Sequence, residues 1–135
     1  MATSLTAAFT RYGAELRNPR WAVSSIAPDG ALVLSCWDQF FETMEGGGMR
    51  YSDTLSRWSQ DNPNGSSLCR DHLQSAFDQV LPVRLVIASA KDKQAVEAGN
   101  ASTTKVSFQA RKTHTGRVVE FDGDRLVIEF RRESE

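Results

Sequence analysis

Two aromatic side chains, Trp37 and Tyr51, stand at loop edges where a flat ligand could reach them. Trp37 ends a short apolar run, and Tyr51 follows the Gly46-Gly47-Gly48 loop with Arg50 directly before it. Aromatic rings near an arginine suit a ring ligand such as a nucleobase, because the rings stack and the guanidinium meets phosphate. Taken alone, the pattern favours the other interpretation, in which both rings are core residues at the end of a sheet.

Other reactive groups are sparse and lack the spacing that chemistry requires. Cys69 and His72 are the only pair at metal-ligand spacing, and Cys69 falls on the apolar face of a predicted helix, which favours a core cysteine and a surface histidine. Asp29 follows a proline, but no Glu-x-Lys or Asp-x-Lys comes after it at the distance a nuclease motif needs. No glycine-rich phosphate loop is present. The sequence therefore predicts a protein that is not an enzyme, with no catalytic residue, cofactor or metal.

Basic residues are concentrated in one stretch of the chain. Residues 83–117 hold seven of the 16 basic residues and two of the 17 acidic ones, a net charge of +5. The remainder, with nine basic and 15 acidic residues, has a net charge of −6. This asymmetry allows one basic face on a nearly neutral protein, although an ordinary solvated surface is equally consistent with it.

Periodicity and turn signals predict the elements that would position these residues. They are a helix over 4–17, a hairpin over 21–37, an irregular region over 38–65, a helix over 66–80, a strand over 83–90 and C-terminal strands over 105–131. Asn18-Pro19 is expected to end the first helix, and Asp122-Gly123 to turn a hairpin. The apolar strand over 83–90 is expected to pair beside residues 31–37, because both runs suit strands buried on two faces.

These elements predict a single α+β domain over residues 1–135, with a mostly antiparallel sheet of five or six strands packed by two helices. No apolar run approaches the ~18 residues of a membrane span, so no membrane partner is expected. Cys36 and Cys69 both fall in apolar patterns, which predicts free buried thiols and a cytoplasmic protein. A monomer and a homodimer both remain open, since the strand over 105–111 could be a sheet edge, although its charges oppose pairing.

The order of motifs over residues 21–90 is similar to that of a known family. A hairpin strand ends Leu-Val-Leu-Ser-Cys-Trp (32–37), a loop with a tyrosine and a helix follow, and the strand Val-Arg-Leu-Val-Ile-Ala-Ser-Ala (83–90) comes next. This arrangement resembles the N-terminal DNA-reading domain of McrA-type (HNH) modification-dependent restriction endonucleases. The resemblance implies that an aromatic pair holds a modified cytosine while basic residues follow the phosphates. Trp37 matches the family tryptophan by its place at the strand end, and Tyr51 best matches its aromatic partner.

The resemblance also implies a reader without a nuclease, because the family's HNH half, with its zinc cysteines and catalytic histidine, has no counterpart in these residues. The sequence thus predicts a small DNA-binding module that reads modified cytosine, such as 5-methylcytosine, in double-stranded DNA. Trp37 and Tyr51 would contact the base. The residues expected to meet phosphates are Arg50, Lys105, Arg111 and Lys112.

Two other classes of function remain open. A protein-interaction or inhibitory accessory protein of a mobile element would bind its partner through residues 38–61, and the acidic N-terminal two-thirds of the chain supports it. A small-ligand-binding domain would hold a flat metabolite in the aromatic cleft, but the sequence offers no catalytic group beside it.

Overall fold

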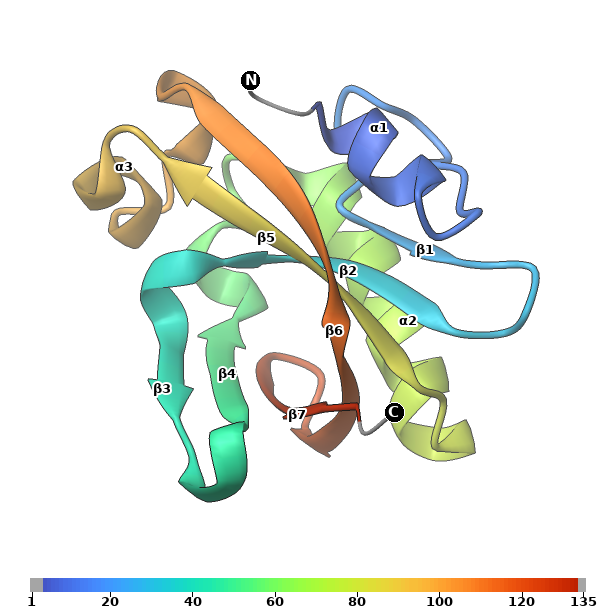
Figure 1. The fold of residues 1–135 in the computed structure, drawn as a ribbon. Helices are drawn as coiled ribbons and strands as arrows, with labels where there is room; N and C mark the ends of the chain where they lie inside the picture. Colours follow the sequence, from blue (N-terminus) through green and yellow to red (C-terminus); the bar gives the residue numbers. More distant parts are fainter. Residues whose placement is uncertain (1–3, 134–135) are drawn as a thin grey trace.

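A strongly twisted, mixed sheet of seven strands runs through the structure, a computed structural model that describes residues 4–133 (Figure 1). The strands are β1 (Ser24–Ile26), β2 (Leu32–Trp37), β3 (Phe41–Thr43), β4 (Met49–Thr54), β5 (Val83–Ala90), β6 (Val106–Phe121) and β7 (Arg125–Arg132). The helices are α1 (Leu5–Thr10), α2 (Pro63–Gln79) and α3 (Lys93–Glu97). The strand order is β1-β2-β5-β6-β7-β4-β3, and the α+β class is confirmed.

Helices α1 and α2 cover opposite faces of the central strands (Figure 1). Successive side chains of a strand point to opposite faces. In β2, Leu32 and Leu34 pack in the cluster that contains Leu73 of α2, whereas Val33 packs in the cluster that contains Phe9 of α1. Because both faces are covered, the sequence of β2 is apolar at every position except Ser35.

The expected pairing of the two apolar strands is confirmed. β2 and β5 run parallel, in a register that pairs Leu32 with Val83 and Trp37 with Ala88. Every other strand pair in the sheet is antiparallel, including the β1–β2 hairpin and the β6–β7 hairpin at Asp122-Gly123. The mostly antiparallel character is therefore correct, whereas the expected count of five or six strands is too low.

Strand β6 is a single long strand that bends between its two partners. Its first part pairs with β5 and its second part with β7. The register with β5 shifts around Leu85, whose carbonyl oxygen accepts a hydrogen bond from the Tyr12 hydroxyl at 2.7 Å. Burial raises the pKa of Tyr12 to about 12, so the phenol stays protonated and keeps this donor. This bulge changes the direction of β6, as bulges commonly do. The Tyr12 hydrogen bond connects the segment after α1 to β5 at the position of the bulge.

The first helix is shorter than expected. It ends at Thr10 instead of residue 17, because Gly13 takes a left-handed conformation (φ 73°) just beyond it. The Gly13 amide donates to the Thr10 carbonyl and the Ala14 amide to the Phe9 carbonyl, which is the Schellman pattern of a helix end. The expectation of a helix over 4–17 is therefore wrong beyond Thr10.

Two further expectations need correction. Residues 38–65 are not wholly irregular, since they contain the β3–β4 hairpin, in which Phe41 pairs with Tyr51. The second helix begins at Pro63 instead of residue 66, because Asn62 caps it and proline is well suited to a first helical position. A third short helix, α3, joins the two that were expected. Within residues 4–133 we find no helix with both the length and the apolar character of a membrane span.

Candidate functional site

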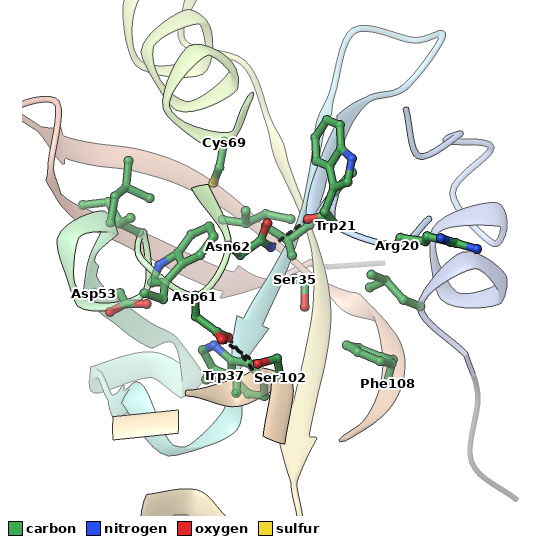
Figure 2. Close-up of a pocket in the computed structure, with 18 of the residues that line it drawn as sticks. Arg20, Trp21, Ser35, Trp37, Asp53, Asp61, Asn62, Cys69, Ser102 and Phe108 are labelled. Atoms are coloured by element: carbon green, nitrogen blue, oxygen red, sulfur yellow. Dashed lines mark hydrogen bonds between the residues drawn. The ribbon is translucent and has the colours of Figure 1, made fainter. Parts of the chain in front are cut away.

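A cavity of about 340 Å³ opens beside the end of β2, where β1 no longer pairs with it (Figure 2). The three tryptophans of the chain, Trp21, Trp37 and Trp58, all line it. Each comes from a different segment: Trp21 precedes β1, Trp37 ends β2, and Trp58 follows the short 3-10 helix Leu55–Arg57. The polar side chains of the lining are Arg20, Ser35, Asp53, Asp61, Asn62 and Ser102. A lining of apolar and aromatic side chains with a few polar groups is the usual form of a ligand pocket.

Asn62 fixes the position of Trp21. Its side-chain amide donates to the Trp21 carbonyl at 2.8 Å, while its oxygen accepts from the Gly65 amide at 2.9 Å. A Cβ at Gly65 would lie 2.4 Å from that carbonyl, so the close approach requires glycine. The start of α2 is thereby locked to the segment before β1, and the Trp21 side of the cavity is held in place.

Tyr51 forms part of the cavity wall, with its ring and hydroxyl both engaged. Its hydroxyl accepts a hydrogen bond from the Trp37 amide at 3.1 Å and lies 3.4 Å from an Asp53 oxygen, to which it donates. Its ring packs against Phe41, with 4.9 Å between ring centroids. Burial raises the pKa of the Tyr51 phenol well above its ordinary value, so it remains neutral. Tyr51 therefore orients Trp37 and leaves the tryptophan ring as the surface that a ligand meets.

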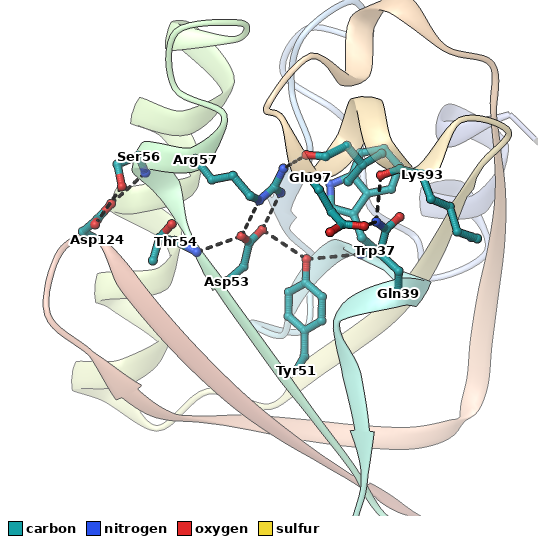
Figure 3. Close-up of polar contacts among 11 residues, drawn as sticks. Trp37, Gln39, Tyr51, Asp53, Thr54, Ser56, Arg57, Lys93, Glu97 and Asp124 are labelled. Carbon is teal, nitrogen blue, oxygen red and sulfur yellow. Dashed lines mark hydrogen bonds and ion pairs between the residues drawn. The ribbon is translucent and has the colours of Figure 1, made fainter.

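Behind this wall lies a buried ion pair (Figure 3). Asp53 and Arg57 form two parallel hydrogen bonds of 2.8 Å, and their side chains are only 6% and 15% exposed. Asp53 also accepts from the Thr54 amide at 2.8 Å. Arg57 donates to the Val96 carbonyl and stands 4.8 Å from the ring centroid of Phe40. The pair thus joins the end of β4 to α3.

The segment that contains α3 is held by contacts with residues that follow β2 and β4. Lys93 pairs with Asp38 at 2.9 Å, and the Gln39 amide donates to the Lys93 carbonyl at 2.9 Å. Gly99 has φ 82°, and a Cβ there would lie 2.0 Å from the Arg57 carbonyl oxygen, so only glycine permits the contact. The cavity is therefore preformed by packing and hydrogen bonds.

A second polar cluster lies on α2, beside the Cys69 wall of the cavity. Ser24 Oγ lies 2.8 Å from His72 Nδ1, and Ser24 is buried. The expectation of a surface histidine is therefore wrong: His72 is partly buried and bonded to β1. The expectation of a core cysteine is confirmed, and burial raises the pKa of the Cys69 thiol to about 12. Such a thiol is unreactive at neutral pH.

The partly buried His72 predicts that stability depends on pH. Burial lowers the pKa of His72 below its ordinary value of 6.5. As pH falls through the range below 6.5, the unfolded chain binds a proton that the folded protein does not, so the free energy of unfolding decreases. We expect urea unfolding to give lower stability at about pH 5.5 than at about pH 8, and His72→Gln to reduce this difference. His114→Gln, on β6, is the matched control, and an unchanged pH difference in His72→Gln would contradict the prediction.

The structure brings together the two predicted base-binding residues, but not the predicted phosphate-binding ones. Trp37 and Tyr51 both line the cavity. Arg50 lies on β4 and pairs with Glu129 at 3.0 Å. The other three, Lys105, Arg111 and Lys112, lie just before β6 or within it, and none of the four lines the cavity.

Sequence reasoning missed several residues of the cavity. Trp21 was expected only within the hairpin over 21–37, and Trp58 only within the irregular region over 38–65. Arg20, the cationic residue of the lining, lies outside the basic stretch over 83–117, and no sequence motif marked it as a site residue. Asp61 was expected only as part of a loop.

The chain matches no protein-family model, no curated protein and no solved structure. The chemistry of the cavity therefore defines what it can hold. Indole faces suit a planar ring, and the polar groups between them can orient its edges. Among residues 4–133 no group of three or more His, Cys, Asp or Glu side chains is placed to hold a metal ion.

Proposed function

We propose that the protein is a DNA-binding module that holds one modified cytosine, such as 5-methylcytosine, in the tryptophan cavity. The observation that carries this proposal is the convergence of Trp21, Trp37 and Trp58 on one cavity of about 340 Å³. Stacking on an aromatic side chain contributes about 1–3 kcal/mol per base. The resemblance of residues 21–90 to a modified-cytosine reader, with Trp37 at the matching strand end, supports the same ligand.

The concave form of the site determines how duplex DNA would bind. A base inside a duplex is stacked on both sides, so it reaches a cavity of this kind only by rotating out of the helix. Rotation costs a few kcal/mol, which stacking in the cavity and contacts to the phosphates must offset. The bound duplex is therefore opened at one base pair.

Basic residues near the cavity can provide the phosphate contacts. Arg20 is exposed and lines the cavity itself. β6 contributes Phe108 to the cavity, and Lys112, further along β6, lies 5.8 Å from the Tyr12 ring centroid. Lys105 and Arg111 form no ion pair with any residue from 4 to 133. We expect Arg50 to contribute less, because Glu129 already pairs with it.

Fluorescence anisotropy of labelled duplexes at two salt concentrations tests the proposal. We expect fully methylated duplex to bind more tightly than hemimethylated or unmodified duplex, and all affinities to fall with salt. Four phosphate contacts predict a slope of about −3.6 in log K against log salt concentration, and Lys112→Gln should reduce its magnitude by about 1. Arg125→Gln is the control, since Arg125 pairs with Glu120 at 3.5 Å beside the β6–β7 turn. Absence of binding at low salt would overturn the proposal. Equal binding of all duplexes would show that the protein binds DNA without recognising the modified base.

A small-ligand-binding domain is the second candidate, favoured by the same preformed cavity. Indole faces near carboxylates also suit an organic cation such as a quaternary ammonium group. This function would appear as binding of a free ligand such as choline, while no duplex binds. Under the DNA proposal, choline does not compete with methylated duplex.

A further inference from the structure

The cavity lining contains two carboxylates, and the hydrogen bonds of Asp53 are already taken. A carboxylate has about four lone-pair positions. The two Asp53 oxygens accept bonds from Arg57, from the Thr54 amide and from the Tyr51 hydroxyl. Its charge is matched by the Arg57 guanidinium, and its side chain is 6% exposed. Asp53 therefore has no acceptor left for a ligand.

Asp61 is different, because it keeps acceptor capacity at the cavity. One of its oxygens accepts from the Ser102 amide at 3.1 Å and the other from the Ser102 hydroxyl. Within residues 4–133, Asp61 forms no ion pair. About two of its lone-pair positions are thus open. Figure 2 shows Asp61 and Ser102, joined by a hydrogen bond, among the side chains that line the cavity together with Trp37.

We infer that the cavity selects a ring with an exocyclic amino group, and that Asp61 is the residue that specifies it. A ring stacked on Trp37 would present its edge to this carboxylate. An amino group there donates to the carboxylate, whereas a keto oxygen meets it as a second acceptor and is repelled. Ser102 is the positioning residue, because it holds both oxygens of Asp61. This inference rests on the proposed function and adds the chemical class of base that the site takes.

5-Methylcytosine and thymine provide a matched pair of probes. Both carry a 5-methyl group, and the first has an amino group where the second has a keto oxygen. Two labelled single-stranded oligonucleotides that differ only in this central base are titrated with the protein at low salt. We expect the wild-type protein to bind the 5-methylcytosine strand about tenfold or more tightly.

Asp61→Asn should abolish or reverse this preference. The asparagine oxygen can still accept from the Ser102 amide, which leaves the side-chain NH₂ to face the ligand as a donor. A donor suits the keto oxygen of thymine and opposes the amino group of cytosine. The measured quantity is the ratio of the two dissociation constants, because a general loss of folding or affinity affects both strands alike.

Two further variants complete the test. Ser102→Ala removes the hydroxyl that holds one oxygen of Asp61 but keeps the backbone amide that holds the other, so it should reduce the preference without abolishing it. Asp71→Asn makes the same change of charge on the exposed side of α2, outside the cavity, and should leave the ratio unchanged. Binding of both strands without preference, or a preference that survives in Asp61→Asn, overturns the inference and leaves the proposed function standing. If neither strand nor methylated duplex binds, the proposed function fails and this inference with it.

Discussion

Replacement of Asp53 by alanine should lower the free energy of unfolding by about 3–5 kcal/mol, because the Arg57 guanidinium would remain buried without its partner. The two side chains form a bidentate pair, 6% and 15% exposed, behind the cavity wall. Asp53 also accepts bonds from Thr54 and Tyr51, so its removal leaves these donors unpaired as well. Urea unfolding at neutral pH measures the effect.

Two further variants separate the buried charge from other causes. The double variant Asp53→Ala/Arg57→Met removes the stranded charge and should be more stable than Asp53→Ala alone. Glu120→Ala breaks the exposed pair with Arg125 and should change stability by only about 0–1 kcal/mol. A loss below about 1 kcal/mol in Asp53→Ala would contradict the role given to this ion pair.

Trp37→Ala should weaken binding of methylated DNA by about 5- to 150-fold, the equivalent of the 1–3 kcal/mol that stacking of one base contributes. Trp37 ends β2, and its backbone amide donates to the Tyr51 hydroxyl, so its position depends on β2 and Tyr51 and the ring can be removed separately. Anisotropy titrations of methylated duplex at fixed salt measure the change.

The controls for Trp37 use aromatic side chains in other places. Trp37→Phe keeps a ring in the cavity and should recover part of the affinity. Phe77→Ala removes an aromatic ring from α2 that is 37% exposed and does not line the cavity, and it should bind like the wild type. If Trp37→Ala folds and binds methylated duplex at wild-type affinity, Trp37 does not hold the base.

The central strands could be predicted because the local pattern and the tertiary environment agree there. β2 and β5 are covered on both faces, so their sequences are mainly apolar and their ends stand out. The end of α1 was missed because an apolar periodicity continues past Gly13, while the backbone turns there. β3 and β4 were not resolved within residues 38–65, because β3 is a three-residue strand at the sheet edge and most side chains of both strands are only partly buried or exposed, so the alternation is weak.

The cavity could be predicted only in part, because long-range contacts assemble it. Trp37 and Tyr51 could be proposed, since each stands beside a recognisable break in the chain. Trp21 and Trp58 reach the cavity through contacts far apart in sequence: Asn62 with the Trp21 carbonyl, and Gly99 against the residue before Trp58. Arg50 was proposed because it precedes Tyr51, but neighbours in a strand point to opposite faces, and Arg50 pairs with Glu129 instead.

Intrinsic tryptophan fluorescence tests base binding in the cavity most directly, because all three tryptophans of the chain line it. We expect titration with unlabelled methylated duplex to quench the emission in a saturable manner, at the same concentrations that anisotropy reports for binding. Unmodified duplex should quench less at equal occupancy, because fewer bases rotate into the cavity. If methylated duplex binds by anisotropy while the tryptophan emission does not change, the base does not enter the cavity and the proposed mode of reading is wrong.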